Sequence, residues 1–164
     1  MISRSWIIDA ERNTSERIRA FHRYWHGKCG SADVPLRAHV DALEIPRMLP
    51  YISLTEIETP FRVRYRLVGT KVAESNGADF TGRYLDECGF AVESFLRDCY
   101  QRMVATRAPI FAYYEWDKPD MRNALGRLGA SVTGFFPLSS DGKAVDRAIS
   151  IEDSDVLPFD PRTR

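Results

Sequence analysis

Three segments of the chain are predicted to form α-helices. The first begins at Asn13, which forms a capping box with Glu16, and its apolar residues recur at helical spacing. These residues are Ile18, Phe21 and Trp25. A short helix is expected over residues 71–76, and a longer one over residues 90–106. The apolar stripe of the longer helix consists of Val92, Phe95, Leu96, Cys99 and Met103. The first and third helices are therefore amphipathic and need an apolar surface to cover.

Five further segments are predicted to be β-strands, and the clearest of them alternate apolar and polar residues. Residues 52–58 and 61–69 are joined by a turn at Thr59-Pro60, which predicts an antiparallel hairpin. The other three strands follow the long helix, at residues 109–116, 125–138 and 145–151. Because a helical block separates two runs of strands, the pattern predicts an α+β fold with an antiparallel sheet.

The charge of the chain is balanced, with 23 basic and 23 acidic residues and a formal net charge of zero. Proteins that bind nucleic acids or anionic membranes usually carry a basic excess. Arg62, Arg64 and Arg66 share one face of the predicted strand at 61–69, but acids nearby offset them. We therefore expect neither a nucleic acid nor a membrane as a partner, and no segment reaches transmembrane length.

The cysteines bear on the compartment and the thiol state. Cys29, Cys88 and Cys99 are odd in number and irregular in spacing, which argues against a disulfide framework. We expect three free thiols and a cytoplasmic protein, because the N-terminal residues also lack the apolar core of a signal peptide.

No repeat or obvious linker divides the sequence. The expected organisation is an N-terminal segment with an amphipathic helix at residues 1–35, one domain at residues 36–155 and a C-terminal tail at residues 156–164. At this length a single domain with a substantial core is the expected outcome.

Candidate reactive groups are sparse. His22 and His26 lie four residues apart on the first helix with Cys29 beyond them, but three donors without a fourth are weak evidence for a metal, and a polar helix face is the simpler interpretation. Residues 77–82 have the glycine spacing of a phosphate loop, yet the residues that follow are not the Lys and Ser or Thr that such a loop needs. No catalytic or metal-binding residue is assigned.

Four short phrases stand out along the chain. They read LPYISL at 49–54, RYRLVGT at 64–70, GADFTGRYL at 77–85 and FPLSSDG at 136–142. In this order they resemble PAS domains, in particular the small single-domain bacterial proteins of the PAS_5 family. The resemblance covers most of residues 14–153. It implies a five-stranded antiparallel sheet with helices over one face, an N-terminal helix, and a pocket between sheet and helices. PAS domains are sensory or interaction modules, and most are not enzymes.

Two familiar cofactors of PAS domains can be compared with these residues. Flavin-binding members carry a reactive cysteine in an Asn-Cys-Arg-Phe-Leu type phrase, whereas Cys88 lies outside any such phrase. Haem-binding members carry a histidine on the long helix, and residues 90–106 contain none. The resemblance therefore supports neither haem nor covalent flavin, and the ligand stays open.

The resemblance and the apolar stripes together indicate a pocket. Its candidate lining residues are Tyr65, Leu67, Phe80, Leu85, Phe95, Cys99, Met103, Tyr113 and Phe135. We expect a stand-alone PAS-like module that binds a small molecule or a protein partner in signalling. The alternative is a small enzyme acting on an acidic or carbonyl substrate, in which Tyr113 or Glu115 works with Arg66. A third possibility is an adaptor with a filled core and no ligand.

The apolar N-terminal residues bear on the oligomeric state. Trp6, Ile7 and Ile8 form an apolar cluster, and the first helix adds its own stripe. Packing against a second copy would bury a patch that is otherwise exposed, which predicts a homodimer. The alternative is that one chain folds its own helix back over its sheet.

Overall fold

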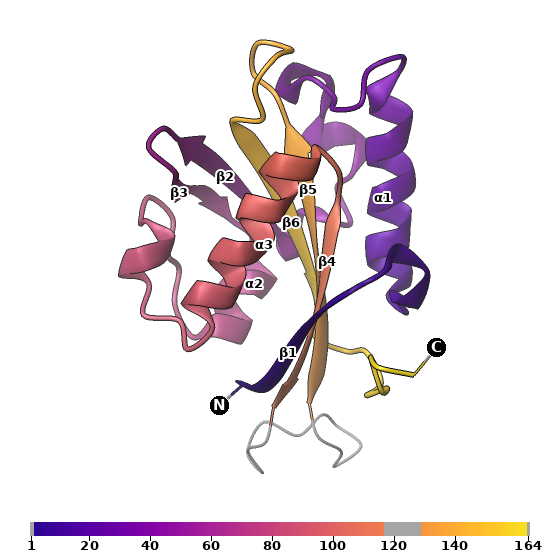
Figure 1. Ribbon diagram of the computed structural model, residues 1–164, viewed down its shortest axis with the longest axis vertical. Helices are drawn as coiled ribbons and strands as arrows, with labels where there is room; N and C mark the ends of the chain where they lie inside the picture. The colour runs from indigo at the N-terminus through magenta and orange to yellow at the C-terminus, as the bar shows by residue number, and fades with distance from the viewer. Residues whose placement is uncertain (1, 117–128, 164) are drawn as a thin grey trace.

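One antiparallel sheet organises the computed structural model, which describes residues 2–116 and 129–163 (Figure 1). Its strands follow the order β1-β4-β5-β6-β2-β3. In chain order they are β1 (Ile2–Ile8), β2 (Ile52–Glu58), β3 (Arg62–Val68), β4 (Ile110–Trp116), β5 (Ala130–Leu138) and β6 (Arg147–Asp153). The α-helices of the same residues are α1 (Glu16–Cys29), α2 (Thr70–Asn76) and α3 (Glu93–Thr106). The predicted α+β class is confirmed.

The sheet has one strand more than the five predicted, and the additional strand is β1. It lies antiparallel to β4, with Trp6 opposite Tyr113 and Ile8 opposite Phe111. Trp6, Ile7 and Ile8 were expected to form an apolar cluster outside the sheet, but their backbone pairs with an edge of β4 that would otherwise be open.

The helices lie on opposite faces of the sheet, α1 on one face and α2 with α3 on the other (Figure 1). The predicted stripe of α1 is fully packed against the sheet: Ile18, Phe21 and Trp25. Trp25 Nε1 donates to the carbonyl of Pro137 at 2.9 Å, and the ring of Phe21 meets that of Phe136 edge-on at 4.8 Å. The segment predicted at residues 1–35 thus contributes a strand and a helix to the same sheet.

This packing removes the basis of the homodimer expectation, because the helix stripe is buried within its own chain. Of the N-terminal cluster, Ile8 is buried as well, in the core that α1 covers. The homodimer stays a prediction, but it is no longer needed to bury the apolar stripe of α1.

Helix α1 begins later than its capping pattern predicts. Its N-cap is Ser15, whose Oγ accepts a hydrogen bond from the backbone N–H of Ile18 at 3.2 Å. Asn13 lies two residues earlier in the chain, and its Oδ1 accepts from the N–H of Ser15 at 3.0 Å. Ser15 Oγ also donates to Asp153 Oδ2 at 2.5 Å, so the hydroxyl that caps the helix also ties it to the end of β6.

Strand β5 is buried on both faces and separates two cores. Its even-numbered residues, such as Val132 and Phe136, belong to the core beneath α1, and Phe135 belongs to the core beneath α3. Gly134 allows the close approach of α1, because a Cβ there would lie 2.6 Å from the ring of Phe136 and 3.0 Å from Ile18.

Candidate functional site

A cavity of about 320 Å³ lies between the sheet and a layer formed by α2, α3 and the joining segment, residues 77–92, that connects these two helices. This volume lies within the range of small-molecule sites in proteins. Its polar residues on the sheet side are Ser53, Ser131, Thr133, Ser150 and Glu152. The aromatic residues around it are Tyr65, Phe80, Phe90, Tyr100, Tyr114 and Phe135. The cavity is therefore an aromatic chamber with a polar floor.

The polar floor follows from strand alternation. On β5, Ser131 and Thr133 face the cavity while Val132 faces α1. On β6, Ser150 and Glu152 occupy the corresponding positions, and Ile151 between them lies in the core beneath α1. One face of the same two strands is thus apolar and the other carries hydroxyls and a carboxyl.

Three buried polar atoms at the cavity have no hydrogen-bond partner among the described residues. They are the hydroxyls of Tyr100 and Tyr114 and the Oε2 atom of Glu152. Tyr100 is 1% exposed and Tyr114 is 5% exposed, and they come from α3 and β4 respectively. An unpaired buried polar group costs about 1–3 kcal/mol, so three around one cavity are unusual in a folded protein.

Burial also sets the protonation of these groups. It raises the pKa of the Glu152 carboxyl from 4.5 to about 7. It raises the pKa of Tyr100 to about 12, although nearby hydroxyls of Thr55 and Ser150 offset part of the rise, and it raises that of Tyr114 well above the usual value. At neutral pH the tyrosines are therefore neutral, and Glu152 is poised to gain or lose a proton.

Aromatic rings from β3 and the joining segment form one side of the chamber. The rings of Tyr65 and Phe80 meet edge-on with centroids 4.6 Å apart, and those of Phe80 and Phe90 do so at 5.1 Å. Edge-to-face contacts of this kind favour one relative placement of the rings. The position of the joining segment therefore decides the shape of the cavity.

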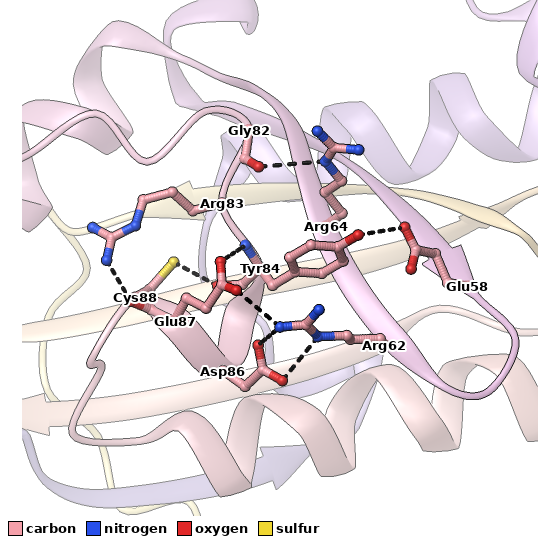
Figure 2. Close-up of polar contacts among 9 residues, drawn as sticks. All are labelled: Glu58, Arg62, Arg64, Gly82, Arg83, Tyr84, Asp86, Glu87 and Cys88. Atoms are coloured by element: carbon pink, nitrogen blue, oxygen red, sulfur yellow. Dashed lines mark hydrogen bonds and ion pairs between the residues drawn. The ribbon is translucent and has the colours of Figure 1, made fainter.

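A polar cluster on the outer surface holds this segment against the sheet (Figure 2). Arg62 on β3 donates to both carboxylate oxygens of Asp86 at 3.0 Å and to Glu87 at 3.0 Å. Its guanidinium lies 3.6 Å from the ring centroid of Tyr84, and Tyr84 donates from its hydroxyl to Glu58 at 3.0 Å. The bidentate geometry ties the segment to the hairpin of β2 and β3.

Backbone bonds continue the same attachment. The N–H of Gly82 donates to the carbonyl of Tyr65 at 2.7 Å, and the N–H of Tyr65 donates to the carbonyl of Arg83 at 2.9 Å. Tyr65, which lines the cavity from the edge strand β3, is therefore hydrogen-bonded through its backbone to the joining segment that carries Phe80.

Comparison with known families identifies this architecture. The PAS_5 family model, which describes a PAS domain, matches residues 13–147. The chain belongs to the PAS_5 family. Strand β1 lies before the matched residues, and all of β6 after Arg147 lies beyond them. A search of curated proteins finds no match. In the described part of this PAS domain, no helix is long and apolar enough to cross a membrane.

The PAS fold brings some of the predicted pocket residues together at the cavity. Tyr65, Phe80 and Phe135 line it. Four others belong to the core on the same face of the sheet but are not among its lining residues: Leu85, Phe95, Cys99 and Met103. The stripe of α3 thus faces the sheet as expected, but its part nearest the cavity consists of Val92, Leu96 and Tyr100.

Two predicted pocket residues lie elsewhere. Tyr113 faces the core beneath α1, and its neighbour Tyr114 faces the cavity, because β4 alternates in the opposite phase to the one expected. Leu67 is 48% exposed. A bulge in β3 is the reason: Leu54 pairs with Leu67 and Thr55 with Tyr65, so one residue is unpaired and the chain changes face.

The pocket residues that were not predicted from the sequence are those whose polar atoms have no hydrogen-bond partner among the described residues: Tyr100, Tyr114 and Glu152. Tyr100 directly follows Cys99 of the predicted stripe of α3, and Glu152 directly follows the predicted end of the last strand. One sequence feature did point to the cavity. Ser131 and Thr133 place hydroxyl groups at alternate positions of a strand that is buried on both faces, which indicates a polar site inside the protein.

The residues of the enzyme alternative are not brought together. The Tyr113 hydroxyl donates to Glu115 Oε1 at 3.0 Å on β4, whereas Arg66 lies on β3 and pairs with Glu56 at 3.7 Å. Three strands separate β4 from β3 in the sheet, which corresponds to about 19 Å. Tyr113 and Glu115 therefore lack the guanidinium that this alternative assigned to them.

The histidine pair on α1 also diverges. The ring of His22 lies against those of Phe111 and Phe136, at 5.4 and 5.6 Å, whereas His26 is exposed. Burial lowers the pKa of His22, which favours its neutral form in this aromatic setting. Within residues 2–116 and 129–163, no group of three or more His, Cys, Asp or Glu side chains is placed to hold a metal ion.

The three cysteines are free, as predicted. Cys99 is fully buried in α3, and burial raises the pKa of its thiol to about 12, while Cys29 and Cys88 are partly exposed. Because the thiolate is the reactive form, we expect Cys99 to react with dithionitrobenzoate about 100-fold more slowly than the other two. Absorbance at fixed pH measures the rates. All three should react fast in urea, and three fast thiols in the native protein would contradict the burial of Cys99.

Proposed function

We propose that this PAS domain is a sensory module that binds a small organic molecule in the cavity beneath α3, and that it has no catalytic activity of its own. The observation that carries the proposal is the set of unpaired polar atoms on Tyr100, Tyr114 and Glu152, which all line one cavity. A bound molecule with polar atoms would supply the missing hydrogen bonds, and it would fill a space that a packed core would not leave open.

The signalling part of the proposal rests on the family. PAS domains serve as sensory or interaction modules, and this chain belongs to one such family. In that role the domain would report occupancy of its cavity to a protein partner. The attachment of the joining segment through Arg62 and Tyr84 offers a surface close to the cavity wall.

The test of ligand binding uses a variant that fills the cavity. Ser131→Leu adds apolar volume at a cavity-lining position, and Ser31→Leu makes the same change at an exposed residue as a control. Native mass spectrometry of freshly purified protein should find a non-covalent small molecule on the wild type and on the control, and should lose it on Ser131→Leu.

A panel of small metabolites in a thermal-shift assay completes the test. Compounds that bind should raise the melting temperature of the wild type and of Ser31→Leu but not that of Ser131→Leu. An apo mass together with no compound that distinguishes the two variants would refute the proposal and favour an adaptor without a ligand.

A further inference from the structure

The charge of the cavity is carried by one residue. Among the described lining residues, Glu152 alone has a carboxyl group, and none is an Arg, Lys or His. Its Oε2 atom is buried and has no hydrogen-bond partner among the residues that the structure describes. A buried carboxylate is stable only when a positive group or several hydrogen-bond donors compensate it.

The bases nearest to Glu152 in the chain are paired elsewhere. Arg17 on α1 donates to the backbone carbonyl of Glu152 at 3.2 Å, and its charge is matched by Asp153 at 3.2 Å. Lys71 on α2 pairs with Glu74 at 2.6 Å. Both bases line a neighbouring hollow to which Glu152 also contributes, but neither base lines the cavity. Among the described residues, no ion pair joins the Glu152 carboxyl to Arg17 or Lys71, whose charges are matched by Asp153 and Glu74.

The remaining groups around Glu152 suit a cation better than an anion. The tyrosines from β3, α3 and β4 that line the cavity are protonated at neutral pH and add no charge. Ser131 and Ser150 carry hydroxyl oxygens that accept from an N–H group. Aromatic faces attract cations, and an anion would meet no base and would be repelled by the carboxylate.

From this arrangement we propose that the cavity selects a small organic cation, a protonated amine with an apolar body, whose ammonium group pairs with Glu152. The inference rests on the proposed function and names its ligand class. The apolar body would lie against the rings of Phe80, Phe90 and Phe135, and the ammonium would take the place of the cation that the protein does not provide.

Matched pairs of probes test the class of ligand. Phenethylamine is compared with 2-phenylethanol, hexylamine with 1-hexanol, and phenylacetate serves as the anion. Titration calorimetry at pH 7.5 should show each amine binding at least about tenfold more tightly than its alcohol, with no binding of phenylacetate. Glu152→Gln should remove the preference for the amine and leave the alcohol unchanged, while circular dichroism verifies that the variant is folded.

The pH dependence provides a second readout. The amines keep their charge between pH 6 and 8, because aliphatic ammonium groups titrate near pH 10. With the pKa of Glu152 at about 7, about one tenth of the carboxyl is ionised at pH 6, so amine affinity should be about tenfold lower at pH 6 than at pH 8. Alcohol affinity should not follow this profile.

Two results would overturn the inference: alcohols that bind as tightly as their amines, or amines that fail to bind. The proposed function is judged separately, by the Ser131→Leu comparison. A neutral or anionic molecule found on the wild type and lost on that variant would leave the sensory role in place and refute the cationic ligand.

Discussion

Replacing Glu152 by glutamine is expected to raise the free energy of unfolding at pH 8 by about 3 kcal/mol. Burial raises the pKa of this carboxyl from 4.5 to about 7, so the folded chain holds a proton that the unfolded chain has already lost between those values. Stability therefore falls as the pH rises from 4.5 to 7, and the penalty is fully present above pH 7. Glutamine is neutral throughout and removes the penalty.

Urea denaturation at pH 5 and pH 8 measures this effect. The gain of Glu152→Gln over the wild type should be small at pH 5 and large at pH 8. Glu11→Gln, at an exposed carboxyl before α1, is the matched control and should show no comparable difference. An equal gain at both pH values would mean that Glu152 does not titrate in the folded protein as argued.

Gly69→Ala is expected to destabilise the domain by about 3 kcal/mol or more. Gly69 joins β3 to α2 with an ordinary φ of −65°, so its backbone angles do not require glycine. Its surroundings do, because a Cβ would lie 2.4 Å from the carbonyl oxygen of Pro50 and 2.6 Å from that of Leu49. Both contacts are backbone atoms, which cannot rotate away.

The control for this variant is Gly27→Ala. Gly27 lies inside α1, and no atom outside the helix backbone would lie within 4 Å of a new Cβ. Alanine is a better helix former by about 1 kcal/mol, so this change should stabilise the domain. Thermal unfolding of both variants gives the comparison, and a Gly69→Ala protein as stable as the wild type would disprove the close approach.

The elements of the fold were largely accessible from the sequence. The stripe of Ile18, Phe21 and Trp25 predicts α1, and the alternation in residues 61–69 predicts β3 with one partner strand. Strand β1 was not accessible, because Trp6, Ile7 and Ile8 form a short apolar run whose pairing with β4 depends on residues more than 100 positions away. Local patterns do not report such distant pairings.

The faces of the strands were harder to predict. Phe111, Ala112, Tyr113 and Tyr114 are all apolar or aromatic, so alternation in β4 does not show which phase faces α3. The bulge that exposes Leu67 leaves no mark in the sequence around it. Both errors moved residues by one position, and in a strand one position is the difference between two sides of a sheet.

Glu152 was missed for a different reason. A glutamate near the end of a strand is usually solvated, and only the packing of α2 and α3 over β6 encloses its carboxylate. The burial of Glu152 Oε2 thus depends on α2, α3 and β6 together. These elements are far apart in the sequence, so no local sequence pattern predicts it.

The two-sided burial of β5 also bears on how this protein can diverge. Ser131, Thr133 and Phe135 contact the cavity, while the alternate residues pack beneath α1. Mutations at Ser131 and Thr133 therefore re-line the chamber without altering the hydrophobic contacts beneath α1, whereas Phe135 also packs in the core beneath α3. A gene copy can change the polarity of the chamber through the codons of Ser131 and Thr133, and a protein engineer can randomise the same two positions while the core beneath α1 is kept.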